Sequence, residues 1–170
     1  MSQENIAKLI SMLNMSQHPE GGYFVRSYSD DTVGISSAYF LLANNEISHW
    51  HTIQSDELLM FHSGDSLRIY VISPNNIAEL AKAGLSELHS YILGSDVVAG
   101  QKPQIHIPAY SILAMERISD CPNNQQGYSL ISCVVAPPFS FDRFRLCSYN
   151  ELKTKYSYLN QDILKKFSSN

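Results

Sequence analysis

The spacing of apolar residues changes twice along the chain and divides it into three stretches. In the first stretch, apolar side chains recur at the spacing i, i+3, i+4 and i+7, namely at Ile6, Leu9, Ile10 and Leu13. Residues with this spacing lie on one face of a helix. The pattern therefore predicts a short amphipathic helical arm over about residues 3–15.

The second stretch, about residues 18–147, has the pattern of short β-strands. Runs rich in Tyr, Ile and Val alternate with turn residues, and Gly64 marks one tight turn because glycine adopts positive φ readily. The pattern favours an all-β fold, either an antiparallel sandwich or a barrel. Residues 77–84 fit either a helical turn or a long hairpin loop. The predicted strands are residues 36–42, 47–52, 57–62, 66–72, 87–93, 104–107, 111–117, 128–135 and 141–146.

The third stretch is helical again. Ser148 and Glu151 stand three residues apart, which is the spacing of a capping box at the start of a helix. We expect C-terminal helices over about residues 149–168, with a second one beginning near Asn160. Because the chain has no internal repeat and no Pro/Gly-rich linker, residues 1–170 are expected to form a single domain.

Composition and charge exclude several classes of function. The chain is 44% hydrophobic, and its 12 Lys and Arg against 16 Asp and Glu give a net charge of −4 without any basic run. General binding to nucleic acid or to an anionic membrane then has no electrostatic basis. The longest apolar run, Ala38–Ala43, is far shorter than the roughly 20 residues of a membrane helix.

The sequence lacks two further features, a signal peptide and paired cysteines, and both absences bear on the cellular compartment. The N-terminal residues lack the pattern of a signal peptide, so we expect a cytoplasmic protein. The three cysteines, Cys121, Cys133 and Cys147, are widely spaced without a C-x-x-C pair. This favours reduced thiols over a disulfide framework or a structural zinc site.

The densest group of polar residues runs from Ser48 to Glu57. If His49 and His51 lie on one strand, alternation places both side chains on the same face, with Cα atoms about 6.6–7 Å apart. A turn after them would bring Glu57 opposite, which completes two histidines and one carboxylate, a set that binds a divalent metal. The same three residues also fit a hydrogen-bonded polar network that holds no metal.

Alternation also sorts the neighbours of these residues. Glu57, Leu59 and Phe61 should share one strand face, and His62 should point to the other. Trp50, between the two histidines, should point away from them. It would then face whatever covers the outside of that sheet, such as a terminal helix or a partner molecule.

Two other segments offer polar groups to a ligand. Gly21 and Gly22 permit a tight turn, which either closes over the barrel and lends Glu20 or Tyr23 to a ligand, or merely fixes the N-terminal arm with Tyr23 in the core. Gln104 either projects an amide into the barrel or lies on the solvent face of its strand.

The order of these motifs resembles the cupin superfamily, and most closely its cupin-type-5 family of RmlC-like proteins, long catalogued as a domain of unknown function. The resemblance implies a jelly-roll β-sandwich or barrel with short N- and C-terminal helices, which assembles as a homodimer. It extends over about residues 18–150. It is carried by the blocks His18–Phe24, Ser37–Leu42, Ser48–His51, Ser55–Glu57, Gly64–Asp65, Ala99–Gln104, Pro108–Ala109 and Val135–Pro137.

The chain departs from this pattern at a position that matters for metals. A metal-binding cupin supplies a fourth ligand, a histidine five residues after the proline of its second motif, and counting from Pro108 that position is Leu113. A site of His49, His51 and Glu57 would therefore have three protein ligands, for Fe, Mn, Zn or Ni.

Three hypotheses of function remain open, and they differ on whether the protein is an enzyme. The first, from resemblance to the dTDP-4-keto-6-deoxyhexose 3,5-epimerases, is an isomerase or epimerase of a sugar or nucleotide sugar. In it His49 or His51 is the base and Tyr23 or Tyr39 the acid. The second is a metal-dependent oxygenase or isomerase. The third is a non-catalytic protein that binds a small polar metabolite. Candidate ligand contacts are Glu20, Tyr39 and Gln104.

Overall fold

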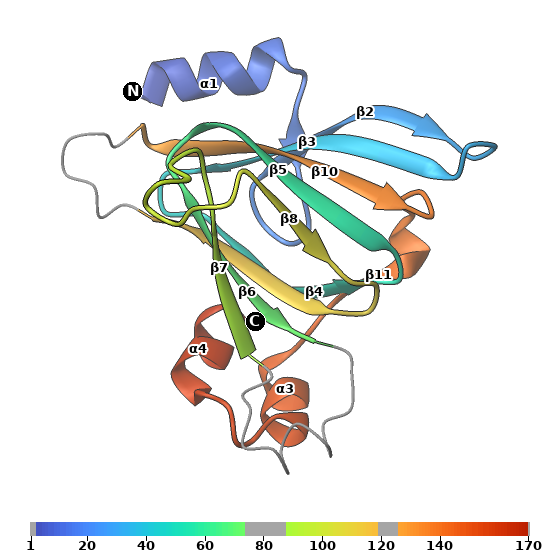
Figure 1. Cartoon of the computed structure of the whole chain (residues 1–170), viewed down its shortest axis with the longest axis vertical. Coiled ribbons are helices and arrows are strands. Elements are labelled where there is room, and N and C mark those ends of the chain that lie inside the picture. Colours follow the sequence, from blue (N-terminus) through green and yellow to red (C-terminus); the bar gives the residue numbers. More distant parts are fainter. Residues whose placement is uncertain (1–2, 74–87, 119–125, 170) are drawn as a thin grey trace.

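The computed structural model describes residues 3–73, 88–118 and 126–169, so the ambiguous stretch 77–84 and Cys121 lie outside the described residues. Two antiparallel β-sheets face each other, with helices on their outer sides (Figure 1). This is the all-β sandwich with helical ends that the hydrophobic pattern predicts. No helix in the described ranges is long and apolar enough to cross a membrane.

Both sheets are built entirely of antiparallel pairs. The first sheet has the order β1 (Ser16–Gln17), β2 (Tyr23–Asp30), β3 (Ile35–Ala43), β10 (Tyr128–Ala136), β5 (Asp56–Gly64) and β8 (Gln104–Ile107). The second has the order β11 (Phe144–Leu146), β4 (Ile47–Ile53), β9 (Ile112–Arg117), β6 (Leu67–Ile72) and β7 (Leu88–Leu93). Several neighbouring pairs, such as β3 with β10 and β4 with β9, are distant in sequence, so each sheet joins segments from different parts of the chain.

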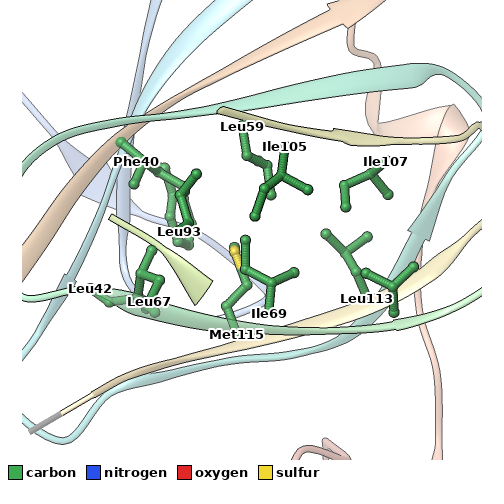
Figure 2. Close-up of a cluster of buried hydrophobic side chains, with 12 residues drawn as sticks. Phe40, Leu42, Leu59, Leu67, Ile69, Leu93, Ile105, Ile107, Leu113 and Met115 are labelled. Carbon is green, nitrogen blue, oxygen red and sulfur yellow. The ribbon is translucent and has the colours of Figure 1, made fainter. Parts of the chain in front are cut away.

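The main hydrophobic core fills the space between the sheets. Figure 2 shows side chains of the first sheet, such as Leu59 and Ile105, pointing toward those of the second, such as Ile69 and Met115. Alternation along each strand sends every second side chain into this space. The buried members are Phe40, Leu42, Leu59, Leu67, Ile69, Val71, Leu93, Ile105, Ile107, Leu113, Met115 and Ile131.

Helix α1 (Gln3–Met12) covers the outer face of the first sheet (Figure 1). The predicted apolar face is confirmed, because Ile6 is buried there and Leu9, Ile10 and Leu13 pack around it. The sheet supplies outward-facing apolar residues to the same cluster, so the first sheet is apolar on both faces. An apolar side chain of this sheet can therefore be buried on the outer face, under α1, instead of between the two sheets.

The C-terminal helices α3 (Tyr149–Lys155) and α4 (Gln161–Lys166) cover the outer face of the second sheet. The predicted cap of α3 is confirmed, since the hydroxyl of Ser148 accepts a hydrogen bond from the N–H of Glu151 at 3.3 Å. Trp50 is 0% exposed beneath these helices, and its indole N–H donates to the carbonyl oxygen of Leu164 at 3.1 Å. Packing beneath a terminal helix thus accounts for Trp50, and the homodimer stays a prediction.

A β-bulge in β4 changes which residues face the interior. Ser48 lies opposite Met115 and His51 lies opposite Leu113, so three steps along β4 match two steps along β9. A bulge inserts one extra residue and so breaks strict alternation. As a result Ser48 and His51 both face the interior, and the expected pairing of His49 with His51 on one face needs correction.

Replacing Trp50 by alanine tests how strongly the C-terminal helices are held. Removal of a fully buried indole should destabilise the fold by about 3–5 kcal/mol, through lost burial and the cavity that remains. The measurement is a urea unfolding curve. Val98→Ala is the control, because Val98 is 101% exposed and its loss should change stability by less than about 0.5 kcal/mol. Equal unfolding midpoints for W50A and wild type would contradict this packing.

Candidate functional site

A pocket opens between the two sheets next to the hydrophobic core. It encloses about 630 Å³ of empty space, part of which is open to solvent, and Phe40 and Met115 line it as well as belonging to the core. Its polar lining residues include His18, Glu20, His51 and Glu57. An apolar pocket with a few convergent polar groups is the usual form of a small-molecule site.

The carboxylate of Glu20 lies at the centre of the polar side of the pocket. It is buried, and its Oε1 accepts a hydrogen bond from the hydroxyl of Ser48 at 2.9 Å. Its Oε2 lies 3.3 Å from His18 Nδ1 and 3.4 Å from His51 Nε2. Burial by itself would raise the pKa of Glu20, but His51, His18 and Ser48 outweigh that effect and lower it. Glu20 is therefore a charged carboxylate between two histidines.

A tight turn delivers Glu20 to this position. Gly21 has φ +107°, and a Cβ there would lie 2.1 Å from the carbonyl oxygen of Ile47, so only glycine fits. The carbonyl oxygen of Glu20 accepts a hydrogen bond from the backbone N–H of His49 at 2.7 Å. The turn is thus fixed against β4, the strand that carries Ser48 and His51.

The hydrogen bonds of His51 define what its second nitrogen can do. Its Nδ1 lies 2.8 Å from the carbonyl oxygen of His49, an acceptor, so Nδ1 carries a proton. In the neutral ring Nε2 is then the unprotonated nitrogen, and it faces the carboxylate of Glu20. Nε2 is thus the ring nitrogen of His51 that can exchange a proton with a group in the pocket.

Glu57 differs from Glu20 although both carboxyl groups line one pocket. It is 7% exposed, and its Oε2 is buried with no hydrogen-bond partner in the described part of the chain. Burial raises the pKa of Glu57 to about 8, and the charge of Glu20 adds to this, while a hydrogen bond with Cys133 opposes it. Glu57 is therefore protonated at neutral pH.

Aromatic rings form the remaining wall. The His18 ring lies edge-on to Phe24 at 4.7 Å and to Phe144 at 5.2 Å between ring centroids, and it stacks on Phe141 at 5.8 Å. Phe24 comes from β2, Phe144 from β11, and Phe141 from the short 3₁₀ helix η1 (Phe141–Arg143). Phe24 and Phe144 line the pocket and exclude water from one side of the polar group, which strengthens its electrostatic interactions, whereas Phe141 is about half exposed.

Of the residues singled out in the sequence, His51, Glu57 and Glu20 come together in the pocket and His49 does not. The Nδ1 of His49 lies 2.7 Å from the carbonyl oxygen of Glu20, so this histidine is used to hold the turn. The bulge is the reason, because it gives the interior position to Ser48 instead.

The other three candidates also lie outside the pocket lining. Tyr23 and Tyr39 point to the outer face of the first sheet and pack in the cluster under α1. Gln104 is exposed, on a strand face where it pairs with Met60. The alternation predicted for β5 is confirmed, since Leu59 and Phe61 join the core while His62 contacts Ser132.

The predicted metal ligands do not fit a metal ion. His49 is directed elsewhere, and Leu113, at the position of the missing fourth ligand, lies directly opposite His51 in the core. Within the ranges that the structure describes, no three His, Cys, Asp or Glu side chains are arranged to hold an ion. The donor set present here is suited to proton transfer and hydrogen bonding.

Lining residues that the sequence does not single out as candidates include His18, Arg26 and Cys133. Ser48, whose hydroxyl donates to Glu20, is missed as well. His18 could have been identified from the sequence, because it begins the segment that contains Glu20. Ser48 was hidden by the bulge, and Cys133 becomes recognisable only when β10 is placed beside β5, where it pairs with Leu59.

Comparison with known proteins supports the fold and the family. A solved structure from Shewanella oneidensis is 36% identical, with a TM-score of 0.79 over 95% of this chain and 96% of that one. A hypothetical protein from Leishmania major is 27% identical, with a TM-score of 0.81 over 96% and 98%. A cupin 2 conserved barrel domain protein from Rhodopseudomonas palustris, 12% identical over 91% of this chain and 87% of that one, shares the fold at a TM-score of 0.54.

No curated protein matches the sequence. The family model described as "Cupin superfamily (DUF985)" matches residues 7–147, which is most of the chain and includes every polar residue of the pocket. The two-sheet sandwich is thus a cupin jelly roll, and the chain belongs to the DUF985 family of the cupin superfamily.

Proposed function

We propose that the pocket binds a small polar metabolite and moves protons on it, as an isomerase or epimerase does. The observation that carries this proposal is the contrast between two carboxyl groups in one pocket. Glu20 is charged beside His51, whereas Glu57 is protonated and has an oxygen without a partner in the described residues. Environments that separate the pKa values of neighbouring groups in this way mark an acid and a base.

The roles follow from the hydrogen bonds. Nε2 of His51 removes a proton from a carbon next to a carbonyl, and the electron pair of that C–H bond becomes a C=C bond. Glu57 gives its proton to the carbonyl oxygen, so an enol forms and no charge is left on the ligand. Glu20 stabilises the imidazolium of His51. Return of the two protons, with the carbon protonated on another face or position, completes the reaction.

This proposal assigns the acid to Glu57 in place of Tyr23 or Tyr39, because both tyrosines lie on the outer face of the sheet. A purely binding protein would use the same unpartnered oxygen of Glu57 to hold a ligand. The two functions are separated by whether a bound ligand exchanges carbon-bound hydrogen with solvent.

Solvent exchange tests the proposed chemistry. Keto sugars, keto nucleotide sugars and 2-oxo acids are incubated with the protein in D₂O, and loss of the C–H signal is followed by proton NMR. His51→Gln should slow exchange by about 100-fold or more, since general base catalysis contributes roughly 10²–10⁴. His106→Gln is the matched control, because His106 is exposed on β8 and pairs with Asp56 outside the pocket. Binding without exchange for every compound would contradict the catalytic role.

The raised pKa of Glu57 has a consequence for stability. Its folded pKa of about 8 exceeds the ordinary 4.5, so its contribution to stability is complete below pH 4.5 and is lost as the pH rises through about 8. The loss is on the order of 4 kcal/mol. Glu57→Gln has no proton to lose, so its unfolding free energy should decline less than that of wild type between pH 5 and 9.

Denaturant unfolding at a series of pH values measures this difference. Glu4→Gln is the control, since Glu4 is exposed and pairs with Lys8 at the helix surface. Parallel pH profiles for E57Q and wild type would show that Glu57 is ionised in the folded protein, and would remove the proposed acid.

A further inference from the structure

Arg26 is the one lysine or arginine that lines the pocket in the described part of the chain. It stands two residues after Phe24 on β2, so both side chains share the face that looks into the sandwich. A β-bulge follows at once, because Arg26 pairs with Ala38 while Tyr28 pairs with the adjacent Ser37. Bulges beside sites re-aim side chains, and this one sets the position of the guanidinium at the rim.

The guanidinium is held but not neutralised. One of its terminal nitrogens donates to the carbonyl oxygen of Phe139 at 3.2 Å, which fixes the group against the aromatic wall. Within the described residues no carboxylate forms an ion pair with it, in contrast to Arg117 with Asp65 and Arg145 with Glu151. Arg26 therefore presents a positive charge and further N–H donors to the mouth of the pocket.

Register places Arg26 across the pocket from Glu57. Arg26 pairs with Ala38 on β3, which pairs with Cys133 on β10. Cys133 in turn pairs with Leu59 on β5. These paired residues form a row across four strands, and its two ends are about 14 Å apart. Glu57 lies two residues from Leu59, on the same strand face. The long side chain of Arg26 shortens the gap, so a compact molecule can contact both ends.

The charge and shape of the pocket select among ligands. A guanidinium has a planar fork of donors that matches the two oxygens of a carboxylate. A nucleoside diphosphate would need more than one cation, and the charge already buried in this pocket, on Glu20, is negative. The walls between the two ends carry Phe24, Phe139 and Phe144, which favour a flat or apolar body.

We propose that the ligand of this pocket is a small monocarboxylic acid with a flat or apolar body, whose carboxylate binds Arg26 while its other end reaches Glu57. This inference rests on the proposed function, because it names the class of compound on which the same site acts. It favours an organic acid over the nucleotide sugars to which the fold first points.

Titration calorimetry at pH 7 with matched compounds tests the inference. The probes are benzoate, its neutral counterpart benzamide, phenyl phosphate and UDP-glucose. Wild type should bind benzoate at least tenfold more tightly than benzamide and more tightly than the two phosphorylated compounds. Arg26→Gln should lower the affinity for benzoate at least tenfold and leave benzamide unchanged. Arg145→Gln removes the same charge outside the pocket and should leave both affinities unchanged.

Three results would overturn the inference: no preference of wild type for benzoate over benzamide, equal benzoate affinity in R26Q, or tighter binding of phenyl phosphate or UDP-glucose. These outcomes are distinct from failure of the proposed chemistry. Exchange that depends on His51 with neutral keto sugars, without carboxylate preference, removes only the ligand class. Benzoate binding that depends on Arg26, without exchange of any compound, removes only the catalysis.

Discussion

The burial of the Glu20 carboxylate constrains the whole site. A charge held between two sheets is costly unless hydrogen bonds and opposite charges compensate it. Its partners come from its own turn and from β4, so the turn must dock on that strand before the charge is satisfied. Once Glu20 is ionised, a second ionised carboxyl close by is unfavourable. Burial is the main reason that the pKa of Glu57 is raised, and the charge of Glu20 raises it further, so Glu57 is protonated.

Local sequence patterns predict much of this fold because they report which face of an element is apolar. The helical face of α1, the cap at Ser148 and the alternation of Glu57 and Leu59 all depend only on near neighbours. The bulge in β4 depends on pairing with β9, and nothing in the local sequence marks it. A shift of one residue replaces His49 by Ser48 in the interior.

The two sheet faces explain the other misplaced candidates. An alternating strand shows two sets of side chains, and sequence reasoning assigns the apolar set to the interior. Here the outer faces are also apolar, because α1 covers one sheet and the C-terminal helices cover the other. Tyr23 and Tyr39 fit the alternating pattern equally well on the inner and the outer face of the first sheet. The packing of α1 on the outer face determines that they lie there. The same double coverage accounts for a 44% hydrophobic content with few charges.

Strand β4 bears His51 on one face and Trp50 on the other. Trp50 is held by residues of the C-terminal segment. The backbone N–H of Trp50 donates to the carbonyl oxygen of Phe167 at 2.8 Å, and its carbonyl accepts from Cys147 at 2.8 Å. During synthesis on the ribosome, the outer face of this strand stays uncovered until those C-terminal residues have emerged. The backbone hydrogen bonds that hold the Trp50 side of β4 thus form only after residue 167 has been synthesised.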